Sequence, residues 1–446
     1  MPSERRFFAS LAWVRGGWAR DVLLECAQGH WTRIASDVGL AGRVGATVLA
    51  GPVLPGLVDA HGHAFQRAMA GLAERSAGTE DDFWSWRDRM YTAANRITPG
   101  QLEAVAAYLY AELLQAGYTQ ICEFHYLHEP KEMVRALAQA SQRTGIGLTM
   151  LPALYMRSGF GASGLRDDQQ RFASTPKSVM DIAREFRANA TSDRITAGVA
   201  LHSLRAADIG AVREVADAAQ DMPVHIHIAE QRREVEDCVA AHGKRPLELL
   251  LSQVRVDERW NMVHATQFDA QELADLRRTG AAIVICPSTE ANLGDGIFDL
   301  GSWMGQSGNW SIGSDSHVTR SWREELRLLE YSQRLHLRKR NVASAAAVTE
   351  SSAAALFQGA LDGGSCAAGV PLAGLKAGER ADFVVIDRDA PELMGIEDEH
   401  LLDALVFSSP ESRFAQVFVA GDRVLGGDES AELARAMRDA MKQIWA

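Results

Sequence analysis

Short apolar runs alternate with amphipathic helical segments through the middle of the chain. From Gly56 onward, eight of these runs have the length and composition of buried strands, and helical segments lie between them. Thr98, Pro99 and Gln101 form a capping box with proline in the first turn of one helix, and Gly117 follows its last turn. Regular alternation of strands and helices predicts a parallel sheet. The expected strands cover residues 56–61, 118–123, 146–151, 196–202, 223–228, 260–264, 281–286 and 310–315.

The two ends of the chain follow a different pattern. Alternating apolar residues at 5–14 and 22–25 predict short antiparallel strands before Pro55. Two more helices are expected at about 322–337 and 344–358, and strand-like alternation then returns in LKAGERADFVVIDRD and AQVFVAGDRVL. We expect an α/β protein, a TIM (β/α)8 barrel with a small β-sandwich domain formed by both chain termini. The expected divisions are 1–54 for the N-terminal part of the sandwich, 55–365 for the barrel, and 366–446 for the C-terminal part with a terminal helix.

Composition and charge narrow the class of protein. The 446 residues can hold a barrel of about 250 residues and a smaller companion domain. A net charge of -12 argues against nucleic acid or an anionic membrane as a partner. The five cysteines show no CxxC spacing, no apolar leader segment begins the chain, and no run approaches the ~20 apolar residues of a membrane span. We therefore expect a cytoplasmic protein with reduced thiols.

Five side chains with metal-binding chemistry stand at the ends of predicted strands. They are His61 and His63 in PGLVDAHGH, His227 in PVHIHIAE, His264 in NMVHAT and Asp315 in SIGSDSH. Residues i and i+2 of a strand point to one face, so His61 and His63 can hold one ion together. An isolated HxH is more often a surface or packing feature. Because the C-terminal ends of barrel strands meet around one mouth, the five residues together predict a metal site.

The ligand types favour one metal ion. Three histidines and one carboxylate suit zinc, with iron or manganese as alternatives. A second ion usually needs a bridging carboxylate, often a modified lysine on the fourth strand, and ITAGVALH contains no lysine. We therefore expect one Zn²⁺ per chain, and water activated by it can attack an electrophilic carbon. His264 need not be a ligand and can hydrogen-bond this water instead.

Glu230 follows His227 by three residues, where the strand passes into a loop. This position suits the transfer of a proton from the attacking water to a leaving nitrogen. The alternative is a solvated acid at a helix start, since EQRREVED is charged and glutamate favours a helix N-terminus. The neighbouring ligand favours the catalytic interpretation. The long segment from Ala64 to Arg96 is the largest insertion in the barrel, and we expect it to form part of the site.

The chain resembles the amidohydrolase superfamily in its mononuclear deaminase branch. HxH on strand one, HxxE on strand five, His on strand six and Asp on strand eight match across the barrel, and LKAGERADFVVID resembles the companion sandwich. More narrowly, it resembles the formiminoglutamate deiminases of histidine degradation, which convert N-formimino-L-glutamate and water to N-formyl-L-glutamate and ammonia. The segments that carry this resemblance are HAFQRAMAGLAE, DDFWSWRDRMY, CEFHYLH, ALHSLRAA and CPSTEANLGDGIF.

The resemblance implies roles for individual residues. Metal ligands would be His61, His63, His227 and Asp315, and the catalytic residues would be Glu230, His264 and Asp315. Substrate contacts would come from Gln66, Arg87, Tyr126, His202 and Arg205. Independently of the resemblance, a guanidinium is well shaped to bind a carboxylate through paired hydrogen bonds, so Arg87 and Arg205 suit a small dicarboxylate. The alternative is that both are ordinary solvated arginines. We also expect a homo-oligomer, a dimer.

Two other functions stay open. A related deaminase could act on a guanine-like or other amidine-bearing substrate, and it would favour an aromatic, uncharged pocket over two arginines. A non-catalytic barrel scaffold is also possible, because a fold alone does not determine function, although no ligand is lost here. For four further histidines we expect structural or supporting roles, and for Cys286 a buried apolar one. These histidines are His125, His128, His225 and His317.

Overall fold

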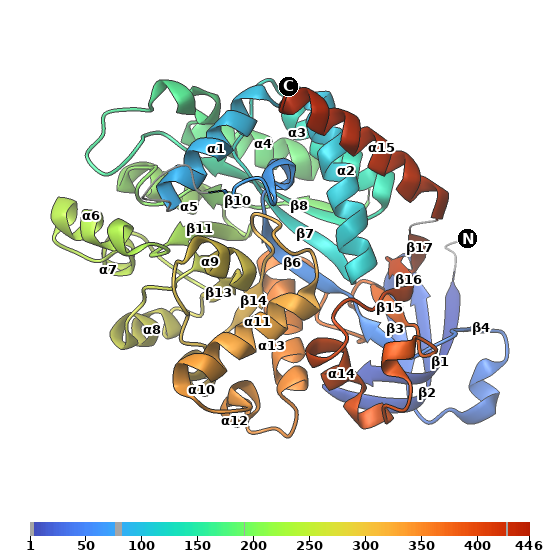
Figure 1. The fold of residues 1–446 in the computed structure, drawn as a ribbon. Coiled ribbons are helices and arrows are strands. Elements are labelled where there is room, and N and C mark those ends of the chain that lie inside the picture. Colours follow the sequence, from blue (N-terminus) through green and yellow to red (C-terminus); the bar gives the residue numbers. More distant parts are fainter. Residues whose placement is uncertain (1–3, 76–82, 191, 425–426) are drawn as a thin grey trace.

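The computed structural model describes residues 4–75, 83–190, 192–424 and 427–446, which form a parallel barrel and a separate smaller sheet (Figure 1). The barrel strands pair in parallel in the order β14, β13, β12, β11, β10, β8, β7 and β6, and β9 also pairs with β8. An isolated parallel bridge between Gly62 and Asp315 joins the first strand to the residues after the last. The strands are β6 (Leu57–Gly62), β7 (Tyr118–His125), β8 (Gly147–Leu154), β9 (Ile195–Ala197), β10 (Val199–Leu201), β11 (Val224–Ile228), β12 (Trp260–His264), β13 (Ala282–Ile285) and β14 (Trp310–Ile312).

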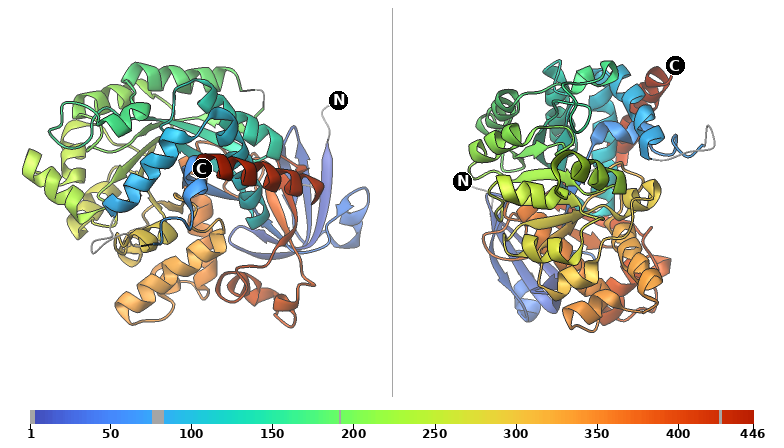
Figure 2. Two further views of the ribbon diagram at one scale, coloured as in Figure 1. Left: turned by 45° about the horizontal axis from the view of Figure 1, so that its top comes forward. Right: turned by 90° about the vertical axis from the view of Figure 1, so that its left-hand side faces the viewer.

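The eight predicted strands are confirmed, and the fourth consists of the two short pieces β9 and β10. Helices connect the strands and cover the outside of the barrel (Figures 1 and 2). They are α2 (Pro99–Ala116), α3 (Glu132–Thr144), α4 (Pro176–Ala188), α5 (Ile209–Ala218), α6 (Arg232–His242), α7 (Pro246–Gln253), α8 (Ala270–Arg277), α9 (Pro287–Leu293), α10 (Leu300–Gly305), α11 (Trp322–Leu337), α12 (Val342–Ala347) and α13 (Ser352–Ala368).

Local sequence signals account for the ends of these helices. Thr98 accepts a hydrogen bond from the Gln101 backbone N–H, and the Gln101 side chain accepts one from Thr98 N–H, as the capping box predicted. Gly117 ends α2 in the left-handed conformation, with a φ of 96° that glycine adopts without steric cost. The first two residues of DDFWSWRDRMY lie outside the described residues, and α1 (Phe83–Arg96) begins directly after them.

The single helix expected at about 344–358 is wrong, because the chain breaks there into α12 and α13. Val348 ends α12 with a φ of 54°, outside the helical region. Ser351 then caps α13 by accepting a hydrogen bond from the Ala354 N–H. A serine ahead of an apolar helical run is a helix-start signal, so the capping residue marked the break.

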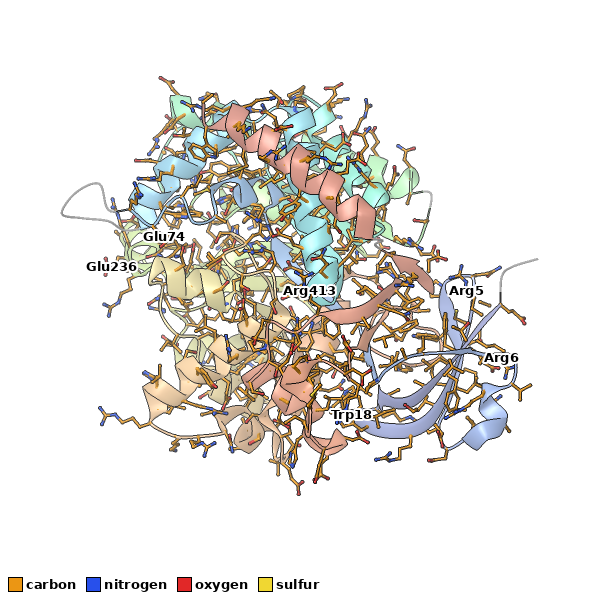
Figure 3. The ribbon with its side chains drawn as sticks, turned by 45° about the vertical axis from the view of Figure 1, so that its right-hand side comes forward. Arg5, Arg6, Trp18, Glu74, Glu236 and Arg413 are labelled. Atoms are coloured by element: carbon orange, nitrogen blue, oxygen red, sulfur yellow. The ribbon has the colours of Figure 1, made fainter. Side chains whose placement is uncertain are left out.

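Both ends of the chain build the smaller sheet, at the lower right of Figure 1. Its strands lie in the order β17, β16, β15, β5, β1, β2 and β3, with β4 beside β1. Phe7, Phe383 and Phe418 pack ring to ring in its core. Figure 3 shows Arg5 and Arg6 on its first strand, on the opposite side of the molecule from Glu236 of α6. The strands are β1 (Arg5–Val14), β2 (Gly17–Ala27), β3 (His30–Ala35), β4 (Thr47–Val48), β5 (Val53–Pro55), β15 (Phe383–Ile386), β16 (Phe414–Val419) and β17 (Asp422–Val424).

The C-terminal segment contributes to both parts of the molecule. Helix α15 (Gly427–Ile444) lies along α2 of the barrel (Figure 2), and Trp445 Nε1 donates a hydrogen bond to the Ala68 carbonyl over 2.9 Å. Strand β5 and helix α13 both run across the expected domain boundaries, so that division stays a prediction.

Among the described residues, no helix is long and apolar enough to cross a membrane. The remaining short elements are η1 (Gly39–Arg43), η2 (Ala64–Met69), η3 (Asp167–Phe172), η4 (Pro391–Leu393), η5 (Asp398–His400) and α14 (Leu401–Phe407).

Candidate metal centre

The seam that closes the barrel holds three of the predicted site residues together. Asp315 N–H donates to the His61 carbonyl over 2.9 Å, and His63 N–H donates to the Asp315 carbonyl over 3.1 Å. Gly313 permits this close approach, because a Cβ there would lie 2.6 Å from His61 Cβ. The backbone of the seam therefore places an aspartate from the end of the barrel beside two histidines from its start.

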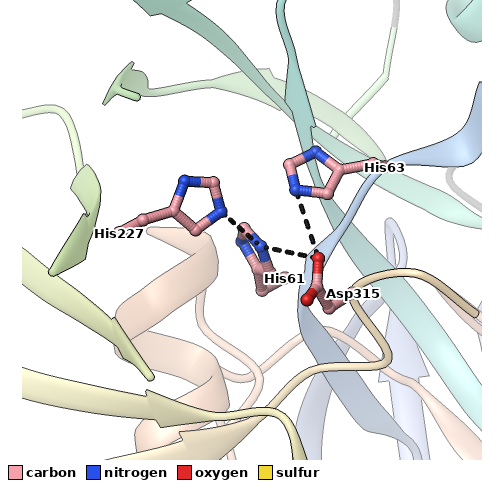
Figure 4. A group of neighbouring side chains, drawn as sticks. All are labelled: His61, His63, His227 and Asp315. Atoms are coloured by element: carbon pink, nitrogen blue, oxygen red, sulfur yellow. Dashed lines mark hydrogen bonds and ion pairs between the residues drawn. The ribbon is translucent and has the colours of Figure 1, made fainter. Parts of the chain in front are cut away.

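His61, His63, His227 and Asp315 form one buried group of ligand atoms (Figure 4). The four atoms all lie within 4.8 Å of one another. Asp315 Oδ1 is 3.3 Å from His61 Nε2 and 3.2 Å from His63 Nε2. His227 Nε2 lies 3.0 Å from His61 Nε2. The structure thus brings together the four residues that the sequence predicted as metal ligands.

The hydrogen bonds of two histidines show which nitrogen is available to a metal. Nδ1–H of His63 donates to the Phe124 carbonyl over 2.6 Å, and Nδ1–H of His227 donates to the His202 carbonyl over 2.8 Å. A carbonyl only accepts, so in each neutral ring the lone pair is on Nε2 and points into the group. The lone pair of His63 Nε2 then faces a carboxylate oxygen of Asp315, so two hydrogen-bond acceptors lie against each other with no proton between them. A cation between them satisfies both, so this donor set fits one divalent ion.

The electrostatics of the group also suit metal binding. Burial lowers the pKa of His61 to about 3, and it holds the pKa of His227 well below its usual range. Both rings are therefore neutral, which is the form that binds a metal. Burial alone would raise the pKa of Asp315, but the close contacts with the His61 and His63 imidazoles outweigh that effect and hold the pKa well below the ordinary value. Asp315 is consequently ionised.

The backbone is strained where the strands end at the site. Ala229, His264, Ala265, Asp315 and His317 all have positive φ values, between 47° and 72°. Such conformations cost about 1–3 kcal/mol each in residues other than glycine and persist where the surrounding structure enforces them. Their concentration at one barrel mouth supports a functional role for this end.

His264 and Glu230 lie beside the ligand group. His264 Nε2 is 3.8 Å from Glu230 Oε1 and 3.9 Å from Asp315 Oδ2. Burial raises the pKa of Glu230 to about 7, close to the value that a group exchanging protons at neutral pH needs. Burial would lower the pKa of His264, but the charge of Glu230 and a hydrogen bond to Glu290 raise it to about 10. The alternative of a solvated helix-start acid does not fit Glu230, which is 7% exposed.

One pocket is lined by three of the four ligand residues, His63, His227 and Asp315, and by all five predicted substrate contacts. Those contacts are Gln66, Arg87, Tyr126, His202 and Arg205. Sequence analysis missed three other lining residues, Trp86, Met90 and Leu293. Trp86 and Met90 belong to α1, in the 64–96 insertion that was expected to contribute to the site. Their helical spacing of four residues was the available signal.

The two arginines of the pocket are buried rather than solvated. Arg87 is 7% exposed and Arg205 is 6% exposed. Burial lowers the pKa of Arg87, and the positive charge of Arg205 lowers it further, so the two cations lie near one another. Arg157 holds the backbone around Arg205 by donating to the carbonyls of Leu204, Arg205 and Ala207 over 2.8–3.2 Å. The positive charge of this wall is suited to an anion.

Four other histidines, His125, His128, His225 and His317, are hydrogen-bonded within the fold. Their partners are the Leu127 carbonyl for His125, the His125 carbonyl for His128, the Ala367 carbonyl for His225 and Ser314 Oγ for His317. None of them belongs to the four-residue ligand group. Cys286 is buried. These contacts agree with the structural or supporting roles expected for these residues.

Comparisons with known proteins give one consistent family. The amidohydrolase family model matches residues 53–424. A formimidoylglutamate deiminase from Pseudomonas aeruginosa is 42% identical over 442 residues, which cover 97% of each chain. A 5-methylthioadenosine/S-adenosylhomocysteine deaminase from Halobacterium salinarum is 28% identical over 87% of this chain and 86% of its own. The crystal structure of an amidohydrolase from Brucella melitensis superposes with a TM-score of 0.92 at 40% identity, covering 99% of this chain and all of that one.

Proposed function

The chain belongs to the amidohydrolase family, and from this premise we propose that it hydrolyses N-formimino-L-glutamate to N-formyl-L-glutamate and ammonia. It is a hydrolase that acts on a non-peptide C–N bond, as its 42% identical relative is a formimidoylglutamate deiminase. The observation that carries the proposal for this chain is the pocket itself. Two buried arginines share it with a metal-binding group, which suits a substrate that has two carboxylates and a hydrolysable C=N bond.

Zinc is the ion that we propose for the ligand group. Three imidazole nitrogens and one carboxylate are typical zinc donors, and iron or manganese would accept the same set less typically. A divalent ion bound there supplies the Lewis acidity that activates water for attack on the formimino carbon. We propose one ion per chain, since the fourth strand offers no lysine for a bridging carboxylate.

The residues beside the ligand group move the protons of the reaction. Glu230 Oε1 takes a proton from the attacking water and delivers it to the nitrogen that leaves as ammonia. His264 Nε2, which lies 3.8 Å from Glu230 Oε1, hydrogen-bonds the water and helps to place this proton. Asp315 accepts from the same water while it contributes to metal binding. Water adds across the C=N bond, which leaves a hydroxyl on the formimino carbon and an amine at the terminal nitrogen. The hydroxyl proton then passes to that amine, the C–N bond breaks with loss of ammonia, and a formyl C=O remains.

The opposite wall of the pocket binds the rest of the substrate. Arg87 and Arg205 each bind one carboxylate through paired hydrogen bonds. Gln66 and Tyr126 are already connected, since Gln66 Nε2 donates to the Tyr126 hydroxyl over 3.1 Å. We propose that this pair and His202 contact the formimino end and the glutamate backbone. Binding energy from the carboxylates then aligns the formimino carbon with the activated water.

The chief alternative is a deaminase that acts on a ring bearing an amidine. It receives some support from the nucleoside deaminase relative, at 28% identity. Two carboxylates would form charge-assisted hydrogen bonds with the two buried guanidinium groups, and an uncharged ring would not, so the pocket favours the dicarboxylate. A non-catalytic scaffold is disfavoured because all four ligands are present and grouped.

Ammonia release from a panel of compounds tests this proposal. The panel contains N-formimino-L-glutamate, formimino-glycine, guanine and 5-methylthioadenosine, each offered to zinc-loaded protein. We expect kcat/KM to be highest for N-formimino-L-glutamate by at least about one decade, because each competitor lacks a carboxylate that an arginine would bind. A purine that is turned over faster would overturn the proposal. The cytoplasmic location and the dimer are further proposals, testable by cell fractionation and light scattering.

A further inference from the structure

The histidines around the pocket differ in what holds their Nδ1 atoms. His63 and His227 each donate to a backbone carbonyl, over 2.6 Å and 2.8 Å. His264 instead faces a carboxylate, with its Nδ1 3.3 Å from Glu290 Oε1. A carboxylate oxygen is the stronger acceptor, and an imidazole held by one is fixed in both tautomer and ring orientation. His264 is therefore held by a partner different in kind from those of the ligand histidines.

Glu290 is itself tightly held. It lies in the first turn of α9 and is 4% exposed. Its Oε1 also accepts a hydrogen bond from the Cys286 backbone N–H over 2.8 Å, so one oxygen serves two donors. Its own backbone N–H donates to the Cys286 carbonyl over 2.9 Å. The carboxylate cannot rotate away from His264 without also breaking the contact at the start of its own helix.

We propose that Glu290 is a positioning residue for His264. It accepts Nδ1–H and thereby turns Nε2 into the pocket, where Nε2 lies 3.8 Å from Glu230 and 3.9 Å from Asp315. Without this acceptor no carboxylate fixes Nδ1, and a displacement of about 1 Å in a reacting group can lower turnover by about 10²-fold. The effect on turnover rests on the proposed function, whereas the orientation of His264 does not.

Kinetics of three variants test the part of this inference that concerns turnover. In zinc-loaded Glu290→Leu, we expect kcat for N-formimino-L-glutamate to fall about 10- to 100-fold, with metal content unchanged and KM within about 2-fold. Glu290→Gln keeps an acceptor oxygen and should recover most of the loss. In a His264→Asn background, Glu290→Leu should cost less than about 2-fold, because its effect passes through His264. Additive losses would overturn the inference.

Glu325 provides a matched control. It is fully buried and also binds the start of α9, where it accepts from Ser288 N–H over 2.8 Å and from Ser288 Oγ over 2.6 Å. Glu325→Leu therefore perturbs the same helix without removing the partner of His264. We expect its kcat per folded, metal-loaded chain to stay within about 3-fold of wild type, the range for changes without a contact at the reacting groups. A loss equal to that of Glu290→Leu would show that Glu290 only stabilises α9.

NMR of ¹⁵N-histidine-labelled protein gives a readout that does not need activity. The His264 Nδ1–H signal, identified by its disappearance in His264→Asn, should be lost in Glu290→Leu and kept in Glu325→Leu. If Glu290→Leu does not fold, Glu290→Asp serves instead, because its shorter side chain cannot reach both donors. An unchanged signal in the Glu290 variant overturns the inference even if no compound is hydrolysed. Wild type that releases no ammonia overturns the proposed function and leaves the NMR result to decide the orientation.

Discussion

Replacing Arg205 with methionine tests whether the pocket was built for a dicarboxylate. Methionine is of similar length and apolar, so the change removes the charge and the paired hydrogen bonds with little change in volume. A charge-assisted hydrogen bond contributes about 1.5–3 kcal/mol, which corresponds to roughly one to two decades in kcat/KM. Because Arg205 is only 6% exposed, solvent screens this interaction little, and we expect a loss in the upper half of that range.

The assay compares two substrates by steady-state release of ammonia. With N-formimino-L-glutamate, Arg205→Met should raise KM strongly, and Arg205→Lys should recover only part of the loss because lysine lacks the planar fork. With a formimino compound that lacks the carboxylate bound by Arg205, the penalty should shrink to less than about 3-fold, since the interaction is already absent. Arg87→Met should show the same pattern with the other carboxylate.

Arg323 is the matched control for the loss of a buried arginine. It is 3% exposed and lies over the Phe414 ring, so Arg323→Met should lower the melting temperature while KM stays unchanged. The proposed role of Arg205 would be refuted if Arg205→Met lost as much kcat/KM on formimino compounds that lack either carboxylate as on N-formimino-L-glutamate. The arginine would then be structural, and the pocket would have been built for another ligand.

Three further predictions concern the metal group and the barrel interior. Asp315→Asn should lower both the bound zinc, measured by elemental analysis, and the turnover. Glu230→Gln should keep about one zinc per chain by elemental analysis and lose turnover, because Glu230 is assigned to proton transfer. Normal activity of Glu230→Gln would contradict that role. Gly313→Ala places a Cβ 2.6 Å from His61 Cβ, so it should lower the melting temperature and weaken zinc binding, and wild-type values for both would show that the seam relaxes. Burial raises the pKa of Glu123 to about 8. Between its unfolded pKa and about pH 8, Glu123 is protonated in the folded state and ionised in the unfolded state, so the free energy of unfolding falls as the pH rises. Denaturant unfolding of Glu123→Gln should show a weaker fall than wild type over that range, and parallel profiles would contradict the shift.

Much of the architecture was predictable because it depends on signals that repeat locally. Apolar runs of strand length and caps such as Thr98 report the conformation of neighbouring residues, which short-range sterics and hydrogen bonds decide. The metal ligands were predictable for a related reason. In a parallel barrel all strand ends reach the same face, so a histidine or aspartate at several strand ends predicts one site before any distance is known.

The tertiary structure alone decided how those residues meet. The bridge from Gly62 to Asp315 brings the end of the barrel against its start, and it puts the carboxylate 3.3 Å from His61 and 3.2 Å from His63. The same packing places His264 beside the ligand group and against Glu290, which no local pattern singled out. Contacts of this kind join residues far apart in the sequence and depend on barrel closure and side-chain packing. Their geometry therefore leaves no mark in the periodicity of either segment.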